Sequence, residues 1–380
     1  MRQNRRLSAR RGNVLVFIVL LMVCIMGILA LSIDVGYLYV VDSEMQRSAD
    51  AAAMSAAWDL LARNVNDTSP EDAALAARAS ADRFASLNLI GGDAPGLADS
   101  DVEIGYLADF RNPNASLDTS DPSRFNAVRL RVRRTNQQNG EVPLYFARVL
   151  GYNSTPMDGR ATATFINNFR GFRIPSSGEN LKILPFALDE ETWEGLSDPS
   201  VTKVDEFTWD QDAREVRAGG DGVYEVNLFP QGTGSPGNRG TVDIGKSNNS
   251  TSDLERQIRY GITQEDLDYI GGSLEFNDAG ELYLNGDTGI SAGMKDALTA
   301  IKGQPRIIPI FRSVTGPGNN ATYTIVKFVG VRILHVDMSG SSKKTKKVII
   351  QPADVVLRGG IPDSGPARSD FLYSPVWLVR

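Results

Sequence analysis

The longest apolar stretch of the chain lies near its N-terminus and predicts a helix that crosses a membrane. Val14 to Ile33 is a run of 20 residues without a charge. At about 1.5 Å per residue, a helix of this length spans the roughly 30 Å hydrocarbon core of a bilayer. The arginines that precede the run are Arg2, Arg5, Arg6, Arg10 and Arg11, whereas Asp34 and Asp42 follow it. Since positive charge stays on the cytoplasmic side, we expect residues 1–13 to be a cytoplasmic tail and the chain from Asp34 onward to be extracytoplasmic.

A cleaved secretory signal is the alternative interpretation of this segment. Ala30-Leu31-Ser32 loosely fits a small-x-small cleavage site behind an arginine-rich start. The apolar run is longer than the about 7–15 residues of a signal, and no turn-forming residue precedes the site. We therefore favour a retained transmembrane helix over residues 14–33.

The pattern after the membrane segment predicts that the same helix continues outward. No proline interrupts it, and apolar and small residues recur at steps of three and four: Val35, Leu38, Val41, Met45, Ala49, Ala52 and Ala56. Small side chains let another helix approach closely, either the chain's own ectodomain or a copy or partner. The candidate interface residues are Gly36, Ala49, Ala52, Ala53 and Ala56.

A second helix is predicted over Pro70 to Leu87. Ser69 is a suitable N-cap, and the acidic pair Glu71 and Asp72 matches the positive end of the helix dipole. We expect residues 34–90 to form an extracytoplasmic pair of antiparallel helices.

The stretch from Arg10 to Ala57 resembles the N-terminal segment of TadG-like proteins of the bacterial tight-adherence (Flp) pilus system. It has an Arg-Arg-Gly start, an Asp-Val-Gly exit from the membrane and the alanine tract QRSADAAAMSAA. The pieces LYFARVLGYNSTPMDGRATATF and KVIIQPA are also similar to TadG-like sequences. The resemblance implies a membrane-anchored, pseudopilin-like accessory protein of pilus assembly or surface attachment. Phe17 stands where prepilin-type signals carry glutamate, which agrees with the TadG-like class rather than the cleaved TadE and TadF pseudopilins.

Strands dominate the remaining chain, so the predicted class is α+β. Residues 91–175 predict a small α+β module with strands at Val102–Leu107, Phe125–Val132 and Arg160–Ile166 and a helix at Pro143–Leu150. Residues 176–380 predict a strand-rich extracytoplasmic domain with short helices at Ser252–Tyr260 and Ser291–Ile301 and a hairpin in LEFNDAGELYL.

Thr322 to Val336 is the longest predicted strand. Strict alternation places Ile325, Val329, Val331 and Ile333 on one face and Val326, Phe328 and Leu334 on the other. Because both faces are apolar, we expect this strand at the centre of a sheet.

The composition of the chain argues against several classes of partner and metal site. Forty basic and 46 acidic residues give a net charge of -6, which argues against a nucleic-acid partner. Cys24 and His335 are the single cysteine and the single histidine, so an internal disulfide, a cysteine-based zinc site and a multi-histidine metal site are excluded. We expect no cofactor and no metal.

Two motifs suggest chemistry that their context does not favour. Gly240 to Ser247 reads GTVDIGKS and matches the phosphate-binding P-loop pattern, but neither a buried strand before it nor a helix beginning at the lysine is predicted, so we expect no nucleotide. Asp337, Ser339 and Ser341 match the D-x-S-x-S start of a metal-dependent adhesion site. Only 39 residues follow Ser341, too few to supply the other ligands of a divalent cation, which needs about six oxygens.

Other polar groups fit structural roles. Arg129, Arg131 and Arg133 lie on one face of a predicted strand and could bind phosphate or an acidic partner, although a solvated face is the simpler interpretation. His335 fits a packed side chain better than a catalytic base. Asp278, Asn285 and Asp287 could form a weak calcium loop but belong to ordinary turn sequences.

These observations predict a non-enzymatic, single-pass protein of the bacterial inner membrane that acts in pilus assembly or attachment. Its partners would be membrane lipid and, through the N-terminal helix, other pilus-assembly or pilin-like proteins. The alternative is an envelope receptor on a membrane anchor, with a ligand-binding or metal-dependent adhesion site in the strand-rich domain.

Overall fold

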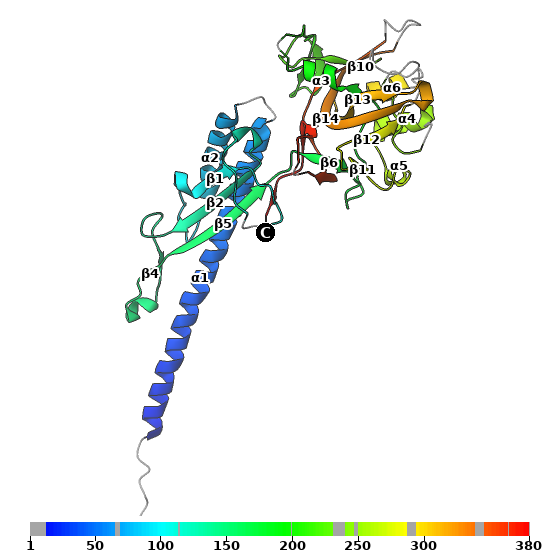
Figure 1. The fold of residues 1–380 in the computed structure, drawn as a ribbon. Coiled ribbons are helices and arrows are strands. Elements are labelled where there is room, and N and C mark those ends of the chain that lie inside the picture. Colours follow the sequence, from blue (N-terminus) through cyan, green and yellow to red (C-terminus); the bar gives the residue numbers. More distant parts are fainter. Residues whose placement is uncertain are drawn as a thin grey trace, which may run out of the picture. The chain divides into compact units, whose positions relative to one another are not determined.

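A computed structural model describes residues 13–64, 69–112, 115–198, 200–230, 240–246, 250–286, 294–338, 346–363 and 365–379. It confirms the α+β class, with a long N-terminal helix followed by strand-rich structure (Figure 1). The chain divides into two compact units. The first comprises Met1–Leu60, Ser69–Thr164 and Trp377–Arg380, and the second comprises Leu61–Thr68 and Phe165–Val376.

Two helices form the helical part of the first unit. Helix α1 (Asn13–Asn64) runs unbroken for 52 residues, so the predicted continuation of the apolar helix is confirmed. Helix α2 (Pro70–Leu87) has the predicted bounds, and the Ser69 side chain accepts a hydrogen bond from the Asp72 N–H. Of the described helices, α1 alone is long and apolar enough to cross a membrane.

An antiparallel sheet of order β1-β2-β5-β20 completes this unit. Its strands are β1 (Val102–Gly105), β2 (Ala127–Arg134), β5 (Met157–Thr164) and β20 (Trp377–Leu378). The short 3-10 helices η1 (Asp99–Asp101) and η2 (Pro122–Arg124) flank β1 and β2. Burial alternates along most of β2, with Val128, Leu130 and Val132 buried, as expected for a strand with one covered face.

The predicted helix over Pro143–Leu150 is mostly wrong. Val142 and Pro143 form strand β3 (Val142–Pro143), which pairs with β4 (Ser154–Thr155). Because Val142 and Pro143 pair with Thr155 and Ser154, the residues between them form a loop in which only η3 (Ala147–Leu150) is helical. Gly151 ends this 3-10 helix in the left-handed region with φ 94°. We call residues 144–153 the hairpin tip.

A seven-stranded sheet organises the second unit, in the order β10-β15-β14-β13-β7 with β12 and β18 also paired to β14. Its strands are β7 (Leu188–Asp189), β10 (Val226–Phe229), β12 (Leu282–Asn285), β13 (Pro305–Thr315), β14 (Thr322–Asp337), β15 (Lys347–Pro352) and β18 (Ser369–Asp370). Strand β14 is central, as predicted.

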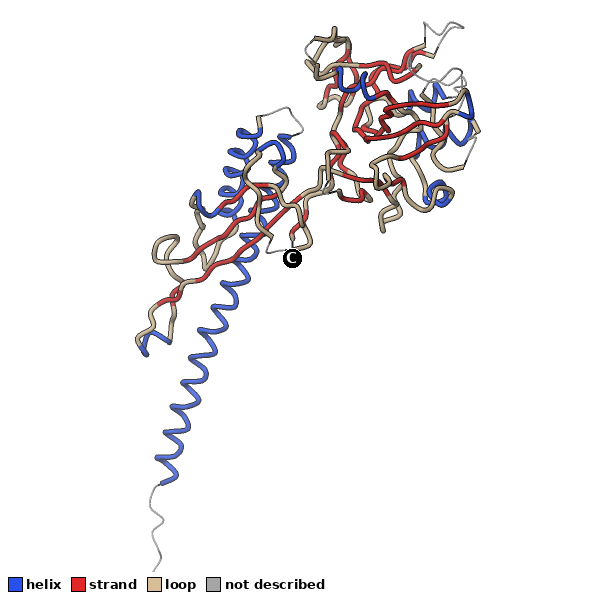
Figure 2. Tube along the Cα trace, in the orientation of Figure 1, coloured by secondary structure: helices blue, strands red, loops and turns tan. Residues whose placement is uncertain are grey.

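Smaller elements surround this sheet. The minor strands are β6 (Phe169–Phe172), β8 (Phe207–Asp210), β9 (Glu215–Ala218), β11 (Leu274–Glu275), β16 (Val355–Val356), β17 (Gly360–Pro362) and β19 (Leu372–Tyr373). The helices are α3 (Glu190–Gly195), α4 (Thr251–Tyr260), α5 (Gln264–Asp268), α6 (Met294–Ala300) and the 3-10 turn η4 (Gly318–Asn320). Figure 2 shows that strands and loops make up most of the second unit.

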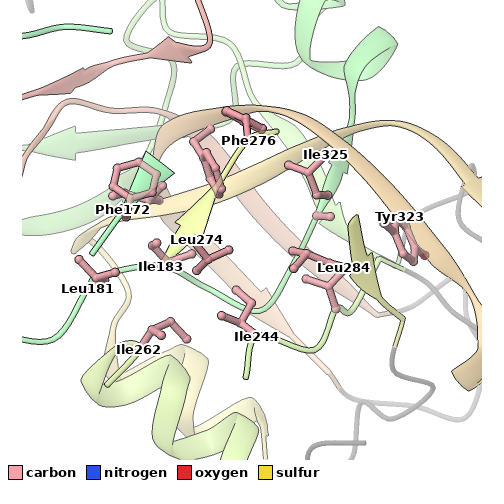
Figure 3. Packing of buried hydrophobic residues seen from close by; sticks show 14 of the residues in the cluster. Phe172, Leu181, Ile183, Ile244, Ile262, Leu274, Phe276, Leu284, Tyr323 and Ile325 are labelled. Carbon is pink, nitrogen blue, oxygen red and sulfur yellow. The ribbon is translucent and has the colours of Figure 1, made fainter. Parts of the chain in front are cut away.

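Apolar side chains lie on both faces of β14. Val329, Val331 and Ile333 pack in a cluster with α4 and α6, whereas Tyr323, Ile325 and Phe328 pack in another with β6 and β11. Figure 3 shows part of the latter cluster, with Tyr323 and Ile325 among its labelled residues. The predicted placement of Ile325 with Val329 was wrong.

A register shift explains this difference. Ile310 of β13 pairs with Lys327 and Phe311 pairs with Ile325, so Val326 is an extra residue in β14. A β-bulge of one residue reverses the alternation of side chains beyond it. It therefore puts Ile325 and Phe328 on the same face.

The predicted hairpin in residues 274–284 is also wrong. Its first half, β11, pairs with β6, and its second half, β12, pairs with β14. The turn itself is present, since the Gly280 N–H donates to the Asn277 carbonyl. The two arms separate because each finds a partner elsewhere in the fold.

Candidate functional site

The candidate interface residues of α1 lie in two different environments. Ala49, Ala52, Ala53 and Ala56 are fully buried in the single chain. Gly36 is exposed, and a Cβ atom added to it would meet no heavy atom within 4 Å.

Helix α2 lies against the alanine-rich part of α1. Its buried residues are also alanines: Ala73, Ala77, Ala81 and Ala85. The Ser48 hydroxyl donates to the Ala85 carbonyl at 3.2 Å, and the Ser55 and Ser80 hydroxyls lie 2.8 Å apart. Ser48, which precedes Ser55 in α1, contacts Ala85, which follows Ser80 in α2. The two helices are therefore antiparallel, and the predicted pairing is confirmed. Of the two interpretations of the small-residue face, packing within the ectodomain accounts for these alanines.

Strand β5 covers a neighbouring part of α1. A Cβ atom on Gly159 would lie 2.9 Å from the carbonyl carbon and oxygen of Met45, which is fully buried. The Gln46 side chain donates to the Arg160 carbonyl at 3.1 Å. The second half of α1 is therefore the centre of the first unit's core.

Asp34, the first charged residue after the apolar run, binds the hairpin tip. Its carboxylate accepts hydrogen bonds from the N–H groups of Tyr145 at 2.8 Å, Phe146 at 3.0 Å and Ala147 at 2.6 Å. Only 3% of Asp34 is exposed. The rings of Tyr37 and Tyr145 meet edge to face, 5.2 Å apart. The end of the predicted membrane segment is thus fixed to a loop more than a hundred residues away in sequence.

Sequence reasoning used Asp34 only to orient the membrane segment. The available signal was the Asp-Val-Gly directly after the apolar run. Removing a carboxylate from water at that border costs free energy unless the carboxylate is hydrogen-bonded or paired with a charge. The sequence therefore indicates that Asp34 has a partner group but does not identify that group.

The three arginines on β2 are paired within the first unit. Arg129 lies 3.5 Å from Glu103 and Arg131 lies 2.8 Å from Asp158. Arg133 Nε lies 2.6 Å from Asp101 Oδ1, a carboxylate whose side chain is 1% exposed. These pairs support a structural role for the arginines rather than recognition of phosphate.

The P-loop pattern lies in a setting unlike that of a nucleotide site. Val242 and Ile244 are fully buried, and α4 begins at Thr251 behind the N-cap Ser250 rather than at Lys246. Ser247 lies outside the described residues. In the part that is described, the helix N-terminus needed to bind phosphate beside Lys246 is missing.

Some of the other candidate polar residues lie within the described ranges and some lie outside them. Asp337 ends β14, while Ser339 and Ser341 of the adhesion motif lie outside the described residues. His335 stacks on Phe207 with ring centroids 5.2 Å apart, which fits a packed side chain. Asn285 donates to Asp243 at 3.3 Å, and Asp278 is exposed in a turn, but Asp287 is outside the description. Within the described ranges, no group of three or more His, Cys, Asp or Glu side chains could hold a metal ion.

Two family models match the chain. One, described as putative Flp pilus-assembly TadE/G-like, covers residues 12–59, and the other, described as putative Tad-like Flp pilus-assembly, covers residues 45–164. No curated protein and no solved structure matches. The second match ends at Thr164, where the first unit leaves the continuous chain. The first unit is therefore that of a Flp pilus-assembly protein of the TadG-like kind, as the residues from Arg10 to Ala57 indicated.

Proposed function

We propose that this protein is a non-enzymatic, pseudopilin-like component of Flp pilus assembly or attachment, held in the bacterial inner membrane by α1. One observation carries the proposal: α1 is a single helix whose first half is apolar and exposed and whose second half is the core of a Tad-type unit. Because one continuous helix would span the membrane and also pack in the core of the unit, the unit would be held at a fixed distance from the bilayer.

The proposed topology is a single pass with the N-terminus in the cytoplasm. Arginines precede the span and acidic residues follow it, which supports this orientation. The two units would then lie on the extracytoplasmic side, where partners in a pilus system are accessible. An enzymatic reporter fused to the C-terminus and active only outside the cytoplasm tests the orientation.

The partner surface is proposed on the exposed side of α1 just beyond the span. Gly36 and Tyr39 lie there, and Tyr39 is 74% exposed. The buried alanines could reach a partner only if α1 separated from α2. Partners are therefore expected to contact Gly36 and Tyr39 rather than Ala52 and Ala56.

Photocrosslinking in native membranes tests this assignment. A photoreactive residue replaces Tyr39, and Tyr260, which is 68% exposed in the second unit, provides the matched control. We expect adducts with pilin-like or assembly proteins from position 39 and none from position 260. Adducts only within the chain at position 39, or the same adducts at both positions, would contradict the proposal.

A further inference from the structure

We propose that the hairpin tip, residues 144–153, inserts its apolar side chains into the interfacial layer of the bilayer that α1 spans. This inference rests on the proposed membrane anchorage of α1. It adds a second membrane contact, made by the folded unit itself.

The position of the tip follows from Asp34. This residue directly follows the uncharged run that ends at Ile33, so it marks the border of the span. Its carboxylate binds the N–H groups of Tyr145, Phe146 and Ala147 at 2.6–3.0 Å. The tip is therefore held at the level where the helix leaves the hydrocarbon.

The side chains of the hairpin tip are largely apolar, although they are exposed to solvent. Val149 is 84% exposed, Leu150 79% and Tyr152 68%, and the rings of Tyr145 and Phe146 are each nearly half exposed. Exposed apolar side chains gathered in one place mark an interaction surface, and tyrosines are enriched at the membrane interface.

The low charge of the hairpin tip favours lipid as the partner that covers it. Arg148 is the one charged residue between Pro143 and Asn153, and its Nε donates to the Leu144 carbonyl within the loop. Without the five N-terminal arginines, the chain has 35 basic and 46 acidic residues, so the rest of the chain as a whole is not drawn to anionic lipid. Binding is therefore expected to come from the burial of apolar side chains.

Spin labels in the full-length chain test the contact. In a Cys24→Ser background, Val149→Cys carries the label in vesicles of phosphatidylcholine with phosphatidylglycerol. Val23→Cys reports the middle of the span, and Leu75→Cys, at a 67% exposed position on α2, reports the aqueous surface. All three positions are exposed, so the label should not disturb the fold.

We expect the label at Val149 to collide with oxygen more often than with a water-soluble nickel complex, as at Val23, and the label at Leu75 to show the reverse. This result should persist in pure phosphatidylcholine, because it depends on apolar insertion. If Val149 behaved like Leu75 while Val23 remained in lipid, the anchor would stand and the proposed contact would be overturned. If Val23 were also in water, the anchorage and the contact would both fail.

Two further outcomes would overturn the proposal in favour of other occupants. A lipid signal at Val149 only in vesicles with phosphatidylglycerol would mean recognition of anionic headgroups through Arg148. A label that stayed in water in vesicles but became immobile in native membranes would mean that the tip binds a protein.

Discussion

Gly159 of β5 lies against the backbone of Met45 on α1, so closely that a Cβ atom would be 2.9 Å from the Met45 carbonyl carbon and oxygen. Backbone atoms in the middle of a helix cannot move aside as the end of a flexible side chain can. The distance between the helix and the sheet of the first unit therefore depends on the absence of a side chain at this position.

Gly159→Ala should accordingly destabilise the first unit. Overpacking of this kind typically lowers the free energy of unfolding by about 1–3 kcal/mol. Urea denaturation of the full-length protein in detergent micelles measures the change. Gly36→Ala is the control: it places the same methyl group in open space on α1, where alanine favours the helix by about 0.5–1 kcal/mol. Equal effects of the two substitutions would contradict the close approach.

Ala52→Leu combined with Ala56→Leu should also lower the stability of the first unit. Both alanines are fully buried, and each larger leucine side chain should cost about 1–3 kcal/mol. Ala79→Leu, at an exposed position on α2, should change the free energy of unfolding by less than about 0.5 kcal/mol. If the double variant were as stable as the unaltered protein, α1 and α2 would not pack as described.

Arg133→Ala should be far more damaging than Arg131→Ala, although both residues lie on β2. Loss of Arg133 leaves the Asp101 carboxylate, 1% exposed, without its cationic partner, which should cost about 3 kcal/mol. Arg131 pairs with the partly exposed Asp158, and such pairs contribute about 1 kcal/mol or less. Chemical denaturation of the two variants measures the difference. Similar losses would mean that Asp101 finds another partner.

Asp34→Asn should loosen the hairpin tip. An amide oxygen is a weaker acceptor than a carboxylate for the three N–H groups of residues 145–147. Hydrogen exchange at these amides should become faster, while exchange in α2 stays unchanged. Asp42→Asn, an exposed position on the same helix, should leave the tip as it is. Unchanged protection in the Asp34 variant would argue against the carboxylate as the holding group.

The stability of the second unit should depend on pH through Asp354. Burial raises the pKa of this carboxyl from 3.8 to about 7, although its own backbone N–H and the positive charge of Arg332 act in the opposite direction. The folded state binds the proton more tightly than the unfolded chain does. The contribution of Asp354 to stability is therefore greatest below about pH 4 and is lost as the pH rises through about 7.

The contribution of Asp354 to the free energy of unfolding should decrease by a few kcal/mol over this range, at about 1.4 kcal/mol for each pKa unit. Asp354→Asn should remove this decrease, whereas Asp278→Asn, in an exposed turn, should retain it. Thermal unfolding at pH 4.5 and pH 8 measures the effect. A pH dependence that survived Asp354→Asn would assign it to other groups.

Local signals in the sequence were sufficient for several elements. The uncharged run predicted the first half of α1, Ser69 and Pro70 predicted where α2 begins, and apolar residues on both faces predicted that β14 is central. Each of these features depends on residues that are neighbours in the chain, through helix capping, hydrophobic periodicity or segment length.

Several features that depend on contacts between distant segments could not be predicted from such local signals. The bulge at Val326 depends on the register with β13, and the arms of residues 274–284 separate because β6 and β14 are nearby. The alanine face of α1 indicated close packing, and the antiparallel pairing with α2 was expected, but the sequence left open whether this face is buried within the chain or contacts a partner.

By itself, the sequence determined that a long apolar helix continues into a segment with a small-residue face, because the uncharged run and the small-residue repeat lie in consecutive residues. Only the tertiary structure decided that Ala52 and Ala56 are internal and that Asp34 holds the hairpin tip at the border of the span. These contacts join residues that are far apart in the chain, since Asp34 and Tyr145 are separated by 111 positions. Their geometry is set by the packing of the whole unit, which no local pattern encodes.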